Sequence, residues 1–144
     1  VKGIQTAEDA DLCVKHGVDV IYVSNHGGRQ LDHGRGAMEL LPEVVSTARG
    51  KAQFVIDGGF VRGTDIMKGI AGGAAMVGIG KLLALALGAA GEPGVVRMLE
   101  ILETELMVNM KLLGTNTCAD LDGTYLQPAT PVTTASVLSA LPLL

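Results

Sequence analysis

The sequence predicts an α/β fold made of about four βα units with parallel strands. Short and almost continuously apolar segments recur along the chain, which is typical of strands buried on both faces of a parallel sheet. Segments with helical start and stop signals lie between them. Each expected strand also ends in glycine and polar residues, where parallel α/β folds place their active sites.

Four strands are expected. The first ends at Val1-Lys2, the second covers 18–24, the third 53–56 and the fourth 75–79. A closed (β/α)8 barrel has eight strands and typically about 250 residues. The pattern alone therefore leaves two architectures open, half of such a barrel or a small doubly wound sheet. Because the chain opens within an element, we expect further residues before Val1.

The first two helices are expected after the first and second strands. Thr6 and Asp9 resemble a capping box, and Gly17 suits the end of the first helix. Pro42 fits the first turn of the second helix, which is expected to run toward Ala48.

Two further helices and a tail complete the predicted order. Thr64 is expected to cap a helix over 65–71. A longer helix is expected from about Pro93 to Gly114, because apolar residues recur there at helical spacing. Residues 1–121 are thus expected to form the α/β unit, and residues 122–144, rich in Thr, Pro and Ser, a C-terminal tail on its surface.

Composition and charge restrict the class of protein. The chain has 144 residues, 48% hydrophobic and 18% charged, which is enough for one domain with a core. The net charge of −4 gives no reason to expect a nucleic acid or an anionic membrane as a partner. Cys13 and Cys118 lack a metal or redox motif, and no signal peptide is visible. We therefore expect a cytoplasmic protein with reduced cysteines.

The strongest candidate for chemistry is His26 with Arg29. His26 follows an apolar strand directly, so it should face a pocket at the end of the sheet, and histidine can remove a proton near neutral pH. Gly27 and Gly28 allow a sharp turn and close approach of a ligand. The planar fork of Arg29 suits a carboxylate. A base beside a carboxylate clamp is what a 2-hydroxy acid requires.

Structural roles are the alternative for His26 and Arg29, and they are expected for the other two histidines. On residue types alone, His26 could equally cap the strand end while Arg29 forms a surface ion pair. His16 beside a helix end and His33 among loop residues are expected to be structural.

A second candidate site binds phosphate. Asp57-Gly58-Gly59 ends the third strand and Gly80-Lys81 follows the fourth, and in barrels the last two such loops commonly bind phosphate. Glycine amides would supply the donors, and Arg62 and Lys81 the positive charge. Ordinary tight turns are the alternative. Lys2 carries no information by itself.

The segment from Ser24 to Asp32, Ser-Asn-His-Gly-Gly-Arg-Gln-Leu-Asp, resembles the signature of the FMN-dependent 2-hydroxy-acid oxidases and dehydrogenases, among them glycolate oxidase, lactate oxidase and mandelate dehydrogenase. The resemblance runs from Val1 to about Leu121. It implies the C-terminal half of a (β/α)8 TIM barrel, FMN as cofactor, and oxidation of a small (S)-2-hydroxy acid to the 2-keto acid. It also implies oxygen, a quinone or a cytochrome as electron acceptor, a homotetramer, and a dehydrogenase form peripheral to the inner membrane.

The resemblance assigns roles to individual residues. His26 matches the catalytic base, and Arg29 matches the arginine that binds the substrate carboxylate. The implied cofactor contacts are Lys2 at the N1 and O2 edge of the flavin, Ser24 on the flavin, Asp57, Gly58 and Gly59 near the ribityl chain and phosphate, and Gly80 and Lys81 at the phosphate.

Two positions depart from the family pattern. The family usually has Asp-Gly-Gly-x-Arg-Arg-Gly, and Val61 replaces the first of these arginines, leaving Arg62. Lys81 replaces the arginine of the family's Gly-Arg-Pro, which keeps the charge but loses the fork. We therefore expect weaker FMN binding than is usual in the family, or compensation by Arg62.

Other functions remain open. In the family, four earlier strands carry the substrate-pocket tyrosines and the aspartate that orients the histidine. The N-terminal half of the barrel, which contains these strands, is therefore an expected partner of this chain. One alternative is another FMN barrel enzyme, such as a type 2 isopentenyl diphosphate isomerase, against which the His-Gly-Gly-Arg spacing argues. A second is a non-catalytic FMN- or phosphate-binding half-barrel, which Val61 and Lys81 keep open.

Overall fold

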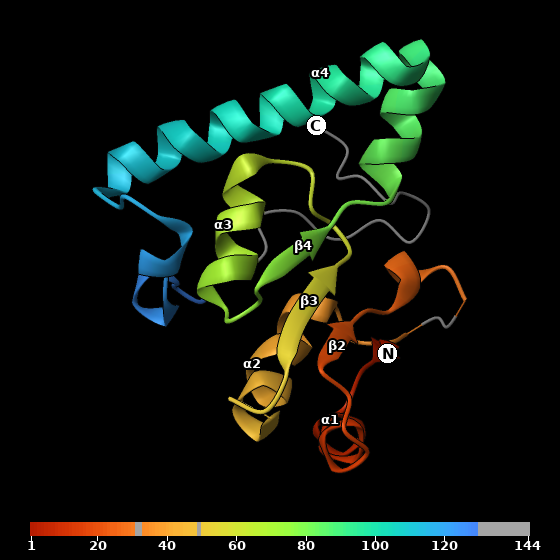
Figure 1. The fold of residues 1–144 in the computed structure, drawn as a ribbon. Helices are drawn as coiled ribbons and strands as arrows, with labels where there is room; N and C mark the ends of the chain where they lie inside the picture. The colour runs from red at the N-terminus through yellow and green to blue at the C-terminus, as the bar shows by residue number, and fades with distance from the viewer. Residues whose placement is uncertain (31–32, 49, 130–144) are drawn as a thin grey trace.

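One parallel sheet forms the centre of the molecule. The structure is a computed structural model that describes residues 1–30, 33–48 and 50–129. Its strands are β1 (Lys2–Ile4), β2 (Val20–Val23), β3 (Gln53–Asp57) and β4 (Met76–Gly78), all parallel and in the order β1-β2-β3-β4 (Figure 1). The predicted α/β fold with four parallel βα units is confirmed.

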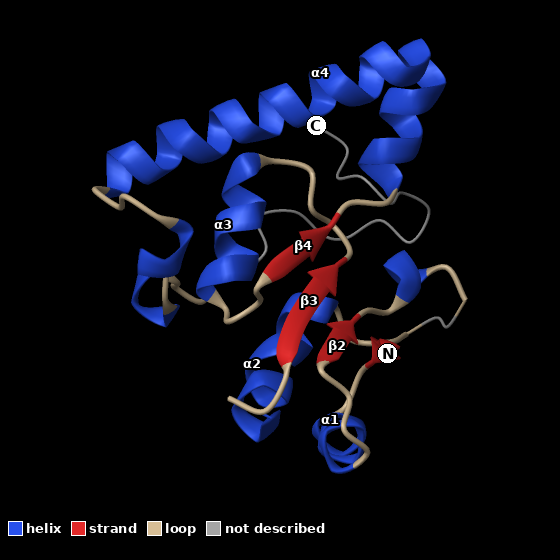
Figure 2. Cartoon of the chain, viewed as in Figure 1, coloured by secondary structure: helices blue, strands red, loops and turns tan. Residues whose placement is uncertain are grey.

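Four helices follow the strands in turn (Figure 2). They are α1 (Ala7–Lys15), α2 (Ala37–Ala48), α3 (Gly63–Ala71) and α4 (Lys81–Leu113). The described part of the chain also has three short 3-10 turns, η1 (His26–Gly28), η2 (Cys118–Asp120) and η3 (Gly123–Tyr125).

The first helix begins and ends as its sequence predicts. The Thr6 hydroxyl accepts a hydrogen bond from the Asp9 amide at 3.1 Å, which satisfies one of the free amides of the first turn. At the other end Gly17 is left-handed, with φ 73°, and its amide donates to the Val14 carbonyl.

The predicted starts of the next two helices are wrong. Helix α2 begins at Ala37, before Pro42, because the Gly36 carbonyl already accepts from two amides of the first turn. Helix α3 begins at Gly63, so Thr64 lies inside it. Asp65 does the capping instead, since its Oδ2 accepts hydrogen bonds from the amides of residues 61 and 62 at 3.2 and 3.0 Å.

Helix α4 has two arms, of which the sequence predicts only the second. It starts at Lys81 and bends where Ala90 and Gly91 leave helical geometry, Gly91 with φ 61° and ψ −144° (Figure 1). Pro93 then lies in the first turn of the long arm, which ends before left-handed Gly114 as predicted. The first arm has exposed leucines at 83, 85 and 87, so it lacks the one-sided pattern that reveals a helix.

By length and composition alone, α4 could cross a membrane. This is weak evidence, because its most apolar part, residues 82–99, is interrupted by the bend at Gly91. A span of hydrocarbon requires about 20 consecutive apolar helical residues.

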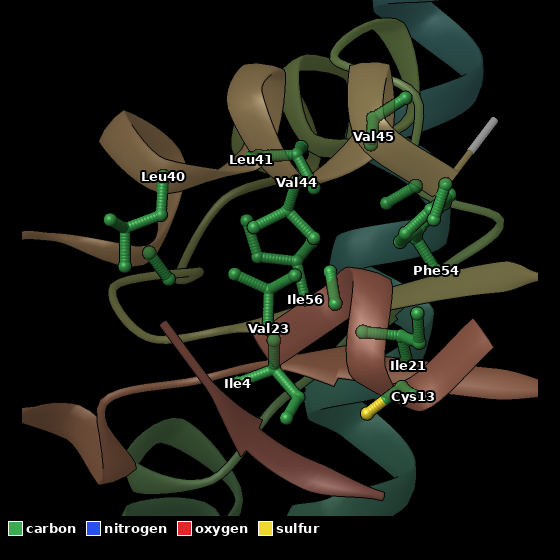
Figure 3. Packing of buried hydrophobic residues seen from close by; sticks show 14 of the residues in the cluster. Ile4, Cys13, Ile21, Val23, Leu40, Leu41, Val44, Val45, Phe54 and Ile56 are labelled. Atoms are coloured by element: carbon green, nitrogen blue, oxygen red, sulfur yellow. The ribbon is translucent and has the colours of Figure 1, made fainter. Parts of the chain in front are cut away.

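The core lies between the sheet and helices α1 and α2. Ile21, Val23 and Ile56 are fully buried and point to these helices, where the apolar face of α2 meets them (Figure 3). Because side chains alternate along a strand, Tyr22 and Asp57 point to the opposite face. A smaller cluster joins α3 and the long arm of α4 to Leu121 and Leu126, so the start of the predicted tail packs on the α/β unit. Residues 130–144 of that tail lie outside the described residues.

Exchanging Gly63 for alanine should destabilise the fold. Helices α3 and α4 meet at this glycine, where a Cβ would lie 2.4 Å from the Leu106 amide nitrogen and 2.6 Å from the Glu105 Cβ. Separating two backbones to relieve this overlap should lower the free energy of unfolding by about 1–3 kcal/mol. Urea unfolding measures it.

Gly88→Ala is the matched control. A Cβ at this α4 position meets nothing within 4 Å, so alanine should raise helix stability by about 0.5–1 kcal/mol. A Gly63→Ala variant as stable as the parent would contradict the described crossing of α3 and α4.

Candidate active site

The candidate active site lies at the carboxyl ends of the strands, where the sequence predicts it. Ser24 directly follows β2, Asp57 ends β3, and Gly80 and Lys81 follow β4. Because the strands are parallel and adjacent, these positions share one edge of the sheet. Lys2 is the first residue of β1 rather than the last, and only its long side chain reaches the others.

Three successive left-handed residues form the turn that carries His26. The φ angles are 57° at His26, 67° at Gly27 and 70° at Gly28. This conformation is uncommon for a residue other than glycine and costs on the order of 1–3 kcal/mol, which the surroundings must offset. Ser24 Oγ accepts from the His26 amide at 3.1 Å, and Asn25 Oδ1 accepts from the Gly28 amide at 3.2 Å. These two side chains hold the turn.

The His26 ring is exposed, and its Nδ1 lies 3.2 Å from Gln30 Oε1. An amide oxygen can only accept a hydrogen bond, so this contact favours the tautomer with its proton on Nδ1. Nε2 then has the free lone pair that a base needs. This part of Gln30 could not be predicted from the sequence, because the contact depends on the tight turn between the two residues.

A polar cluster surrounds the Lys2 ammonium. Its Nζ donates to Ser24 Oγ at 2.8 Å and lies 3.1 Å from Asp57 Oδ2. It also lies 5.0 Å from the centroid of the Tyr22 ring. Ser24 is almost fully buried, with 1% exposure, and accepts from both the Lys2 ammonium and the His26 amide. One hydroxyl thus connects the lysine to the histidine turn.

A cavity of about 330 Å³ brings most of the predicted site residues together. This volume lies in the usual range of small-molecule sites. The predicted site residues that line it are His26, Arg29, Asp57, Gly58, Gly59, Gly80 and Lys81. Lys2 and Ser24 line a neighbouring depression, which also includes His26.

Arg62 lies outside this cavity. Its guanidinium pairs with Glu105 of α4, with Nη2 2.8 Å from Oε1 and Nε 3.1 Å from Oε2. The Gly63 amide also donates to Glu105 Oε2 at 2.8 Å. This amide first, and then Arg62, hold the pKa of Glu105 below its usual range. In this arrangement Arg62 joins α3 to α4 and does not replace the charge missing at Val61.

Lys81 connects the expected phosphate end to the histidine turn. Its Nζ donates to the Gly27 carbonyl at 3.0 Å. Among the cavity-lining residues, Lys81 and Arg29 are the two cations, and Lys81 is the one beside Gly80.

Comparison with known proteins places this geometry in a family. A family model described as FMN-dependent dehydrogenase matches residues 1–128. The chain belongs to the FMN-dependent dehydrogenase family. It is 43% identical over 126 residues to an L-lactate oxidase of Nostoc sp., covering 88% of this chain and 34% of that protein. It is 42% identical over 142 residues to glycolate oxidase 1 of Zea mays, covering 99% of this chain and 37% of that protein.

Solved structures of the family have the same fold. The chain matches a mandelate oxidase variant crystallised with 2-hydroxy-phenylacetamide, with a TM-score of 0.82 and 40% identity. This match covers 85% of the chain and 36% of the oxidase. The chain spans about a third of the length of the relatives it matches.

The site fits the cofactor that gives the family its name. Asp57 Oδ1 is buried and accepts no hydrogen bond from any residue between 1 and 129 that the structure describes. Buried carboxylate oxygens normally have a donor, and a hydroxyl such as those of the FMN ribityl chain would supply one. The backbone around Gly58 and Gly59 is left-handed, with φ 96° and 85°, and carries no side chains to block a ligand. Lys81, which lines the same cavity, would provide charge for the phosphate.

Proposed function

We propose that this chain supplies the base, the carboxylate clamp and the phosphate-binding end of an enzyme that oxidises a small (S)-2-hydroxy acid to the 2-keto acid. The observation that carries this proposal is that His26 and Arg29 line one cavity together with Asp57 and Lys81. FMN, when bound, would accept the two electrons that the substrate loses.

His26 is assigned the role of base. With Nδ1 directed at Gln30, its Nε2 is free to take a proton from the hydroxy acid. The left-handed turn presents the ring to solvent at the end of β2, where a substrate can reach it. The strain in this turn supports a functional role, since such conformations cluster at active sites.

Arg29 and Lys2 are assigned the positive charges that would bind the substrate and the flavin. Arg29 lines the same cavity as the histidine and would bind the substrate carboxylate through its fork. The Lys2 ammonium, held by Ser24 and Asp57, would place positive charge near the flavin ring and favour its reduced form.

The rest of the barrel is also part of the proposal. Strands β1 and β4 are the edges of the sheet, and Val20 and Met76 are exposed on it, at 37% and 53%. Edge strands and exposed apolar side chains favour a covering layer. We infer that the strands that relatives carry beyond the matched third complete this surface.

An anaerobic reduction experiment tests the function. The FMN-loaded protein is mixed with glycolate, lactate or mandelate in the absence of oxygen, and the flavin absorbance is followed. Loss of the oxidised flavin band with at least one acid supports the proposal. FMN binding without bleaching by any of them would favour the non-catalytic alternative, or another FMN barrel enzyme.

Lys81→Met should weaken FMN binding more than riboflavin binding. Lys81 is the cation at the phosphate end of the cavity, and riboflavin has no phosphate. A hydrogen bond to a charged group contributes about 1.5–3 kcal/mol, and exposure of Lys81 keeps the effect near the lower end, about tenfold in Kd. Quenching of flavin fluorescence measures both ligands. Lys68→Met, which removes an ion pair within α3, is the control; equal losses for FMN and riboflavin would exclude a phosphate contact.

A further inference from the structure

Tyr22 lies beside the two charged groups of the polar cluster, Lys2 and Asp57. It occupies the centre of β2, where Ile21 and Val23 on either side are fully buried against the helices. Its side chain therefore points to the opposite face of the sheet. There its strand partner on β1 is Lys2, whose Nζ lies 5.0 Å from the ring centroid. An ammonium at this distance is attracted by the face of an aromatic ring.

The hydroxyl end of Tyr22 extends over β3 and β4. A Cβ at Gly78 would lie 1.8 Å from the Tyr22 hydroxyl oxygen and 3.2 Å from the Asp57 Cβ. The phenol thus fills the space that this glycine leaves free, beside Asp57. Burial, and then the charge of Asp57 and hydrogen bonding to it, raise the pKa of Tyr22.

These contacts place one side chain from each of three strands in a single cluster. Lys2 comes from β1, Tyr22 from β2 and Asp57 from β3, while Gly78 of β4 makes room for the phenol. The Lys2 side chain is 46% exposed and the Asp57 side chain 17%. An exposed lysine side chain loses rotamer freedom when it binds a ligand, and this loss of entropy opposes binding. Contacts that already restrict the lysine in the free protein reduce that loss and therefore favour binding of its ligand.

We propose that Tyr22 is a positioning residue for the Lys2–Asp57 pair: its ring restrains the lysine ammonium, and its hydroxyl restrains the carboxylate. Tyr22 acts through these two groups and not on reacting atoms. The inference rests on the proposed function only in naming FMN as the ligand that Lys2 and Asp57 contact.

The first experiment tests the cluster without cofactor. The chain has no tryptophan and two tyrosines, so in a Tyr125→Phe background the ultraviolet absorbance of tyrosinate reports on Tyr22 alone. We expect the titration of the Tyr22 hydroxyl to have its midpoint above pH 10. Asp57→Asn should lower the midpoint, because a negative neighbour disfavours the phenolate. A midpoint that this substitution leaves unchanged would overturn the proposal.

The second experiment uses FMN at neutral pH. Tyr22→Leu should weaken FMN binding about two- to fivefold, as expected for loss of an exposed cation–π contact, and should lower the reduction potential of the bound flavin. Tyr22→Phe keeps the ring and should retain the potential more closely. The Tyr125→Phe variant is the matched control, because Tyr125 lies on η3, away from the strand ends.

The outcomes separate the two hypotheses. If the parent binds FMN but a folded Tyr22→Leu variant has the same affinity and potential as Tyr125→Phe, the positioning role is wrong. If the parent itself binds no FMN, the proposed function fails, and the titration still decides whether Tyr22 is coupled to Asp57. Far-ultraviolet circular dichroism establishes that each variant is folded, and Tyr22→Phe is the milder substitution.

Discussion

His26→Gln is expected to slow reduction of bound FMN by a 2-hydroxy acid about 10²- to 10⁴-fold, the usual contribution of a positioned general base. Glutamine has nearly the reach of histidine and can still form hydrogen bonds, but it cannot take up a proton near neutral pH. The measurement is the rate constant of anaerobic flavin bleaching in a stopped-flow instrument, at a substrate concentration that saturates each protein.

His16→Gln is the control for this experiment. His16 follows α1 and is exposed, and its contact there is made by its backbone amide, which glutamine retains. It should leave the rate unchanged. A His26→Gln rate within tenfold of the parent would show that another group removes the proton.

Arg29→Met is expected to reduce the affinity for a 2-hydroxy acid by roughly 10²-fold. Methionine fills part of the same space, but it has neither the charge nor the two parallel donors that fit a carboxylate. Hydrogen bonds to charged groups contribute about 1.5–3 kcal/mol each. Arg29 is exposed, so solvent screening keeps the combined contribution of its two bonds well below the sum of two such values. The substrate dependence of the bleaching rate gives the affinity.

A neutral ligand makes the test specific. The amide of the same acid has no carboxylate, so Arg29→Met should change its affinity severalfold less than that of the acid. Arg97→Met, which removes an ion pair with Glu100 within the long arm of α4, serves as the control. Equal losses for acid and amide would show that Arg29 shapes the cavity and does not bind the carboxylate.

The fold was predictable because its strands are short, apolar and separated by clear helix signals. The same signals failed where one residue type serves two purposes. Pro42 suggests a helix start but lies inside α2, and Thr64 suggests a cap where Asp65 provides it. The first arm of α4 is apolar on its exposed side, so a pattern that assumes one buried face could not reveal it.

The candidate site was predictable in outline, since most of its residues lie at the end of a strand or shortly after it. The contacts between residues were not. Arg62 is next to the phosphate end in sequence, yet its side chain pairs with Glu105, which lies 43 residues further along the chain. Tyr22 reads as an ordinary strand residue, and its place beside Lys2 and Asp57 follows only from the register of three strands.

The strand order β1-β2-β3-β4 has a consequence for how the chain folds. Each strand pairs with the next one along the chain, across a single connecting helix. Closing one βα connection costs less entropy than bringing distant segments together, and proteins rich in local contacts fold faster than those that depend on remote pairings. The sheet can therefore grow by successive addition of neighbours, with α1 and α2 covering its first three strands before the long arm of α4 has been synthesised.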